Sequence, residues 1–134
     1  MRNLAFAILL CVGASPALAD MSECDSYASN VEMSQCALQQ YEAADAELND
    51  VWKQVVASIK ATDTDVMPTS EMQKWLGAMT DAERAWATFK DNDCKGGVSY
   101  EWYGGTGAGL AVSTCLYDHT VQRIKDLRAR YLNN

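Results

Sequence analysis

Cysteine is the residue type in this chain whose count and spacing point most directly to chemistry. The sequence has five cysteines: Cys11 lies in an apolar leader, and the others are Cys24, Cys36, Cys94 and Cys115. An even number of cysteines in an exported chain predicts disulfides, here with three possible pairings. A four-thiolate metal site would need close pairs such as Cys-x-x-Cys, which the chain lacks. The sequence therefore predicts two disulfides, no metal site and no cofactor.

Catalysis by a cysteine is the main alternative use of these residues. His119 is the single histidine and follows Cys115 by one helical turn. A Cys–His nucleophile needs a free thiolate, which a disulfide at Cys115 would remove. The glycine-rich residues 105–109 are only superficially like a phosphate-binding loop, because no predicted strand precedes them. We therefore predict that the protein is not an enzyme.

Residues 1–19 predict a cleaved secretory signal peptide. Arg2 supplies a positive charge, and residues 4–12 form an apolar run that is too short to span a bilayer. The small-x-small tripeptide of residues 17–19 then provides a cleavage site. The remaining residues 20–134 have the size of one domain. We expect this domain to be periplasmic or secreted.

The charge of the chain is strongly acidic. Eighteen Asp and Glu oppose eleven Lys and Arg, giving a formal net charge of −7, and loss of Arg2 with the signal would make it more negative. An acidic surface argues against nucleic acid and anionic membrane as partners. No second apolar run is long enough for a membrane helix after cleavage. The charge would instead attract a basic partner.

Three amphipathic stretches predict the fold. Apolar residues recur at steps of three and four along residues 31–60, from about 69 to 91, and from 110 to 131, which is the period of one helical face. A capping box at Ser29 and Glu32 marks the first start, and Pro68 falls in the first connection. Three long helices with short links predict an all-α, antiparallel three-helix bundle.

The predicted bundle favours one disulfide pairing. Antiparallel neighbours bring the end of the second helix beside the start of the third, which suits Cys94 and Cys115. Cys24 and Cys36 would then fold the leading segment onto the first helix. Closing about 20 residues with one such bridge contributes about 3 kcal/mol in the chain-entropy model.

Polar residues at the edges of these apolar helical faces predict a second structural feature. Asp45 and Asn49 lie one turn apart on a shared helical face. We expect a polar network that fixes the register of the helices, with partner contact as the alternative. Its predicted members are Asp45, Asn49, Arg84, Asp91 and Arg123.

The predicted loop of residues 95–109 is the best candidate for binding. It holds most of the chain's eight glycines and an aromatic cluster formed by Tyr100, Glu101, Trp102 and Tyr103. Tyr and Trp dominate interface hot spots because they bury much area at little entropic cost. The alternative is that these rings fold back onto the end of the bundle and complete its core.

Several strings, in this order and spacing, resemble the LprI-type lysozyme inhibitor family. They span most of residues 24–132. Departures from the family pattern include Glu83 where Gln is common and Lys90 where Arg is common. The matching residues are Glu32-Met33 with Cys36-Ala37, Ala43-Ala44-Asp45-Ala46-Glu47-Leu48-Asn49 with Trp52, Ala82-Glu83-Arg84-Ala85-Trp86, Phe89-Lys90-Asp91 with Cys94, and Cys115, Thr120, Arg123 and Leu127.

This resemblance implies an exported protein that binds and blocks a lysozyme-like glycoside hydrolase. The aromatic cluster of residues 100–103 is then the expected contact surface. The alternative is a periplasmic module that binds another protein or a glycan, or acts in envelope stress, without inhibitory activity.

Overall fold

The computed structural model describes residues 21–132, which are helical almost throughout and contain no strand. The predicted signal peptide of residues 1–19 lies outside the described residues. No helix within this range is long and apolar enough to cross a membrane. The elements in chain order are the 3-10 helix η1 (Met21–Ser26), α1 (Asn30–Lys60), α2 (Thr69–Asp91), the π-helix η2 (Asn92–Val98), α3 (Ser99–Glu101) and α4 (Ala108–Tyr131).

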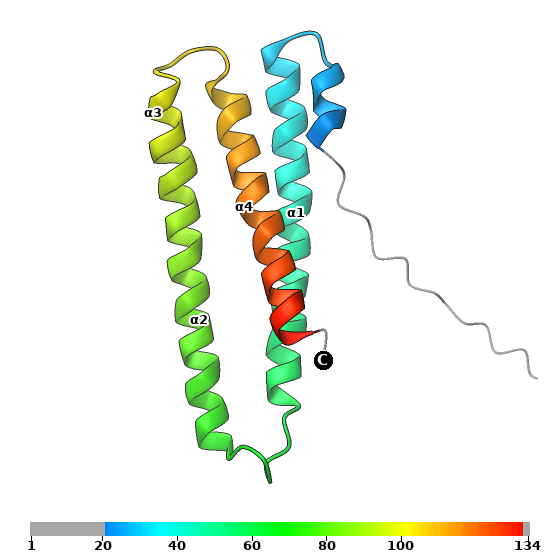
Figure 1. The fold of residues 1–134 in the computed structure, drawn as a ribbon, viewed down its shortest axis with the longest axis vertical. Helices are drawn as coiled ribbons and strands as arrows, with labels where there is room; N and C mark the ends of the chain where they lie inside the picture. The colour runs from blue at the N-terminus through cyan, green and yellow to red at the C-terminus, as the bar shows by residue number, and fades with distance from the viewer. Residues whose placement is uncertain (1–20, 133–134) are drawn as a thin grey trace, which may run out of the picture.

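The arrangement is a bundle of three long helices with a short fourth. α1 and α4 run in the same direction, and α2 runs opposite to both (Figure 1). The predicted all-α fold with two disulfides is confirmed. The structure has four α-helices in residues 21–132 where we predicted three, because α3 forms inside the expected loop.

That loop is much shorter than the predicted residues 95–109. α2 passes through η2 into α3 without a break, so the non-helical part is reduced to residues 102–107. The glycines of this segment predicted a loop, because glycine has a low helix propensity. However, the Cys94–Cys115 disulfide holds η2 against α4, and helical bonding there satisfies backbone groups beside the core.

α1 begins at the predicted capping box. The Ser29 hydroxyl oxygen accepts a hydrogen bond from the Glu32 amide at 3.2 Å. The same hydroxyl donates to the Glu32 carboxylate at 2.9 Å, so Glu32 reaches the Ser29 side chain. The buried positions of α1 follow at helical spacing and form one face: Ala37, Ala44, Leu48, Val51, Val55 and Ile59.

This face packs against α4, and we call the contact the α1–α4 seam. It extends along both helices: an added Cβ on Gly109 would lie 3.1 Å from Ser34 Oγ, and the Ser58 hydroxyl donates to the Tyr131 carbonyl at 3.4 Å. Ala37 and Ala44 are fully buried on α1, and Thr120 is fully buried on α4. Small side chains let the two helices approach closely.

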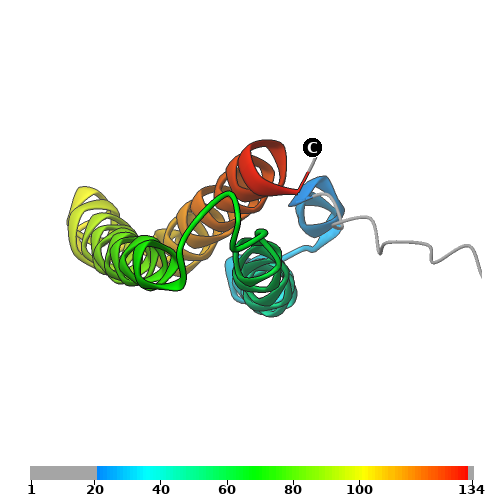
Figure 2. The ribbon, with the colours of Figure 1, turned by 90° about the horizontal axis from the view of Figure 1, so that it is seen from below.

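α2 joins the bundle through larger side chains. Met72 and Met79 are buried, and Trp75 packs with Tyr131 at a ring distance of 6.5 Å. Seen from below, the connection of residues 61–68 crosses from the end of α1 to the start of α2, and these two helices stand apart (Figure 2). The buried core gathers Leu48, Val51, Val55, Ile59, Met72, Met79, Ile124 and Leu127 from α1, α2 and α4.

Candidate functional site

The predicted aromatic cluster lies at the end of the bundle where α3 turns into α4. We call residues 102–107 the strap. Tyr100 at the end of α3 is 80% exposed, and Tyr103 in the strap is 93% exposed. Trp102 is about half exposed. The two tyrosine rings therefore project into solvent and do not complete the core.

A tight turn presents Tyr103. Tyr103 and Gly104 both have positive φ, at 44° and 74°, and the Gly105 amide donates to the Trp102 carbonyl at 2.8 Å. Two successive positive φ values with this hydrogen bond are the pattern of a type I′ turn. A non-glycine residue at positive φ costs about 1–2 kcal/mol, so Tyr103 is held in a strained conformation.

The strap is anchored at several points. The Trp102 ring lies over Gly107, where an added Cβ would sit 2.4 Å from the indole. The Asn30 side-chain amide at the start of α1 donates to the Thr106 hydroxyl at 2.9 Å. A concavity of about 260 Å³ lies between Tyr100 and Tyr103. The turn, the stacking and the hydrogen bond all limit the freedom that the aromatic rings would lose on binding.

Acidic side chains lie on elements at the same end of the bundle as the strap (Figure 1). Glu23 and Glu32 lie on η1 and the first turn of α1, and Glu101 lies on α3, all of them exposed. Lys95 also lies near this end, but its ammonium nitrogen pairs with the Asp91 carboxylate at 3.0 Å. This end of the bundle therefore combines exposed aromatic rings with negative charge.

A groove between α1 and α2 is the second candidate site. Its volume is about 280 Å³, and the indoles of Trp52 and Trp86 face it from the two helices. The lining mixes apolar, acidic and basic groups: Asp45, Leu48, Asn49, Trp52, Thr80, Glu83, Arg84, Trp86, Ala87 and Lys90.

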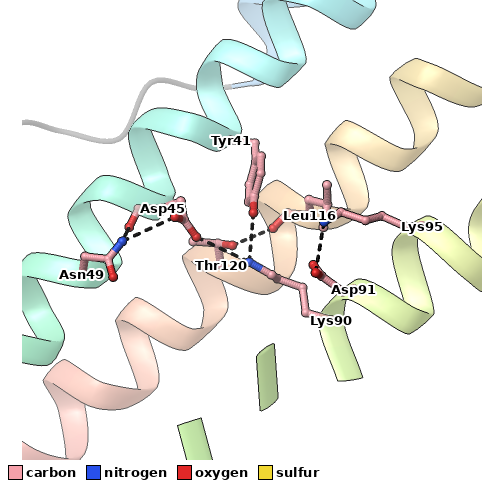
Figure 3. Close-up of polar contacts among 8 residues, drawn as sticks. All are labelled: Tyr41, Asp45, Asn49, Lys90, Asp91, Lys95, Leu116 and Thr120. Carbon is pink, nitrogen blue, oxygen red and sulfur yellow. Dashed lines mark hydrogen bonds and ion pairs between the residues drawn. The ribbon is translucent and has the colours of Figure 1, made fainter. Parts of the chain in front are cut away.

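Lys90 forms the inner end of this groove and is 4% exposed. Its ammonium donates to the Tyr41 hydroxyl at 3.1 Å and lies 3.5 Å from the Asp45 carboxylate (Figure 3). It also sits 4.9 Å from the Tyr41 ring centroid and 5.1 Å from that of Trp86. Charge pairing, hydrogen bonding and two aromatic faces together offset the cost of burying a charge.

The structure brings only part of the predicted polar network together: Asp45, Asn49 and Arg84 line the same groove, but Asp91 and Arg123 bond other partners. Asn49 donates to the Asp45 carbonyl at 2.8 Å, while Asp91 pairs with Lys95 (Figure 3). Arg84 makes a long, exposed contact of 3.5 Å with Asp81.

Arg123 bonds a different partner, Glu83, through its Nε at 2.8 Å and lies 5.8 Å from the Trp86 ring centroid. Lys90, which joins Asp45 to α2, was not among the residues predicted for this network. The sequence does contain a sign of this role: Lys90 lies one helical turn after Trp86 and therefore continues the apolar face of α2.

Both disulfides have the pairing that the spacing favoured. Cys24 bonds Cys36, and Cys94 bonds Cys115, with Cα atoms 5.6 Å apart in each case. His119 does lie near Cys115, but its Nε2 contacts the Asp93 carboxylate at 2.9 Å. With Cys115 in a disulfide, this group offers no thiolate for nucleophilic catalysis.

Comparison with known proteins identifies the family. A profile described as lysozyme inhibitor LprI matches residues 21–127. The chain belongs to the LprI lysozyme inhibitor family. It is also 36% identical over 127 residues to an uncharacterised Rhizobium meliloti (strain 1021) protein, R02472, covering 92% of this chain and 90% of that protein. No solved structure matches. The LprI profile covers the strap, the groove and both disulfides.

Proposed function

We propose that this LprI family protein is exported and inhibits a lysozyme-like muramidase by placing its aromatic strap in the substrate cleft. The observation that carries the proposal is the exposure of Tyr103 on an anchored turn, with exposed Tyr100 of α3 beside it. Tyr100 and Tyr103 line one concavity, and neighbouring exposed apolar side chains of this kind often mark a site of interaction. Membership of an inhibitor family supports a lysozyme as that partner.

The physics of the strap suits the inside of a cleft. Tyr and Trp supply large contact area with few rotatable bonds. The strained Tyr103 already has its turn conformation, so binding does not have to order it. The concavity between Tyr100 and Tyr103 would receive a side chain from the rim of the enzyme's cleft.

The acidic residues at this end of the bundle favour a basic target. Glu23, Glu32 and Glu101 would speed the encounter with a positively charged enzyme. Raising the ionic strength from about 0.01 M to 0.15 M shortens the Debye length from about 30 Å to 8 Å. We therefore expect the association rate to fall steeply with salt, and a salt-independent rate would argue against steering.

Asp45, Asn49, Arg84, Asp91 and Arg123 have a structural role in this proposal. Asp45 and Arg123 connect α2 to its neighbours through Lys90 and Glu83. Their contacts lie along the helices rather than at the strap. We expect variants of these residues to change stability rather than inhibition in the folded protein.

The test is lysis of peptidoglycan by a panel of lysozymes, with the purified oxidised protein titrated in. The variant carries Trp102→Ala and Tyr103→Ala. Loss of two interface anchors, each contributing about 2 kcal/mol, should weaken inhibition by about 1,000-fold. The matched control is Val66→Ser, because Val66 is 79% exposed and lies in the α1–α2 connection, away from the strap.

The outcomes separate three possibilities, once circular dichroism shows that each variant folds. Inhibition that the double variant loses and Val66→Ser keeps supports the strap as the contact surface. Inhibition that both variants keep moves the contact to another face. No inhibition of any enzyme at micromolar excess rejects the inhibitor proposal.

The α1–α2 groove favours a second candidate function, binding of a glycan without inhibition. Two indoles beside Asp45, Asn49 and Arg84 offer apolar faces for a sugar ring and polar groups for its hydroxyls. Titration with soluble peptidoglycan fragments should change tryptophan fluorescence, and Trp52→Ala should abolish that change. No fluorescence change at millimolar glycan would reject this candidate.

A further inference from the structure

Four possible metal ligands converge where η2 meets α4. Asp93, Cys94, Cys115 and His119 each offer one ligand atom, and these four atoms all lie within 4.8 Å of one another. In residues 21–132 this is the only group of its kind. The two cysteines are joined in the disulfide, so the oxidised protein has only the Asp93 carboxylate and the His119 imidazole available.

We propose that reduction of the Cys94–Cys115 disulfide converts this group into a zinc site. Two thiolates, an imidazole nitrogen and a carboxylate oxygen are the donors that tetrahedral Zn²⁺ takes in proteins. Soft thiolates favour Zn²⁺ over Mg²⁺ or Ca²⁺, which prefer oxygen ligands. The proposal is independent of lysozyme inhibition.

The helices already position the ligands. Cys115 and His119 lie one turn apart on α4 and therefore share a face. Asp93 and Cys94 are adjacent in η2, where the wider π-helical turn aims both toward α4. Such π-helical turns recur at functional sites. Ligands on two packed helices need only side-chain rotation to close around an ion.

The site also has an access path and outer contacts. A concavity of about 450 Å³ reaches Cys115 and His119 from solvent, and Asp118 and Gln122 form its rim. Cys94 is fully buried behind it. The Phe89 ring packs nearly perpendicular to the His119 imidazole, with ring centroids 5.4 Å apart, and limits the rotation of the imidazole on that side. Ligand identity, access and outer-shell support are the features expected of a metal site.

The chemistry balances with a dithiol as the reductant. The dithiol transfers two electrons to the Cys94–Cys115 bond and becomes a cyclic disulfide, and its two protons pass to the cysteine thiols. Zn²⁺ then displaces those two protons as the thiolates bind. Oxidation would reverse the sequence, release the ion and restore the S–S bond.

The second disulfide provides an internal comparison. Cys24–Cys36 has the same Cα separation of 5.6 Å, but no such group of ligands surrounds it within the described chain. A variant with Cys24→Ser and Cys36→Ser keeps only the proposed site. Its counterpart with Cys94→Ser and Cys115→Ser keeps only the other pair.

The experiment is Zn²⁺ titration of both variants after treatment with dithiothreitol and its removal under argon, followed by metal analysis. Co²⁺ is the spectroscopic probe, because thiolate ligands and tetrahedral geometry give characteristic absorption. We expect one zinc per chain in the Cys24→Ser, Cys36→Ser variant when reduced and none when oxidised. The Cys94→Ser, Cys115→Ser variant should bind none at the same concentrations.

Single substitutions test the remaining ligands in the Cys24→Ser, Cys36→Ser background. His119→Ala and Asp93→Asn should each weaken zinc binding by at least about tenfold, the range seen even for outer-shell changes. Asp118→Asn is the matched control, since Asp118 lines the concavity but is not among the converging ligands. It should bind zinc as the parent does.

Two results would overturn the proposal. One is absence of stoichiometric zinc in the reduced Cys24→Ser, Cys36→Ser variant. The other is equal zinc affinity in His119→Ala and its parent, which would mean that two thiols alone hold the ion. If the reduced apoprotein unfolds, circular dichroism during the titration decides: zinc must restore the helical signal, and failure to restore it rejects the site.

Discussion

α4 meets its two long neighbours with different kinds of side chain. Toward α1 it buries Thr120 against a face that includes Ala37 and Ala44. Toward α2 it presents Arg123 and Tyr131, which contact Glu83, Trp75 and Met79. The first contact is apolar and includes small groups that allow a close approach, whereas the second depends on long side chains and charges.

This difference explains why the bundle is open on one side. Small side chains at Ala37, Ala44 and Thr120 let α1 and α4 approach closely, and aliphatic side chains fill the rest of the seam, so little space remains between the two helices. Large rings and ion pairs hold α2 at a greater distance, and the groove of about 280 Å³ lies between α2 and α1. The molecule is thus a close helix pair, to which a third helix is attached by large apolar side chains and ion pairs.

The largest expected effect comes from enlarging a seam residue. Ala44 is fully buried, so Ala44→Leu would insert a branched side chain into the α1–α4 seam. The two helices would then have to separate, or the neighbouring core side chains would have to shift. We expect a loss of about 3 kcal/mol, the upper part of the usual range for overpacking. Urea denaturation should show a lower midpoint at unchanged slope.

Ala85→Leu is the control, because Ala85 is exposed on α2 and leucine is also a good helix former. It should leave the midpoint almost unchanged. Equal losses in the two variants would show that the seam tolerates volume and would remove the contrast between the two interfaces.

Lys90 tests the other side of the comparison. Lys90→Ala would leave a cavity among Tyr41 and Trp86 and remove the partner of Asp45. Asp45 is part-exposed and regains water, which limits the expected loss to about 2 kcal/mol. Chemical denaturation monitored by circular dichroism would measure it.

Lys90→Met separates packing from charge, because methionine fills similar volume without the ammonium. Replacement of a buried ion pair by an apolar group of similar volume is often neutral. We therefore expect Lys90→Met to recover most of the stability. A methionine variant as unstable as the alanine variant would show that charge, not volume, attaches α2 to α1.

Glu83 and Arg123 give a smaller effect between α2 and α4. Both side chains are mostly buried, so Glu83→Gln should cost about 1 kcal/mol in the free energy of unfolding. The exposed Asp81–Arg84 pair is the matched control, and Asp81→Asn should stay within about 0.5 kcal/mol. A loss of similar size in Asp81→Asn would contradict the importance of burial.

The sequence was sufficient for the parts of the fold that depend on local pattern. The apolar periods of α1, α2 and α4 are regular, and Ser29 with Glu32 marks the first start. The pairing of Cys94 with Cys115 followed from the direction of consecutive helices. These features need only spacing and chain direction.

Features that depend on the rotation of one helix against another could not be predicted. Whether Arg123 meets Asp45 or Glu83 is decided by the rotation of α4 about its own axis, and this rotation is set by packing of the whole core. The proximity of Asp93 to His119 has the same origin. Residues 92–101 are helical against their glycine content because a disulfide tethers them.

The smallest expected effect lies in the strap and connects stability with function. Asn-Gly is the preferred sequence of a type I′ turn, so Tyr103→Asn before Gly104 should relieve strain and stabilise the protein by about 0.5 kcal/mol or more. Tyr100→Asn, within the helical α3, should not stabilise it. Thermal denaturation of the parent protein and the two variants side by side would resolve this difference.

The same Tyr103→Asn protein should inhibit less well, because the exposed ring is lost while its turn is kept. If the Tyr103→Asn protein gains stability and still inhibits fully, the Tyr103 ring has no role in binding, because the turn alone is then sufficient for inhibition.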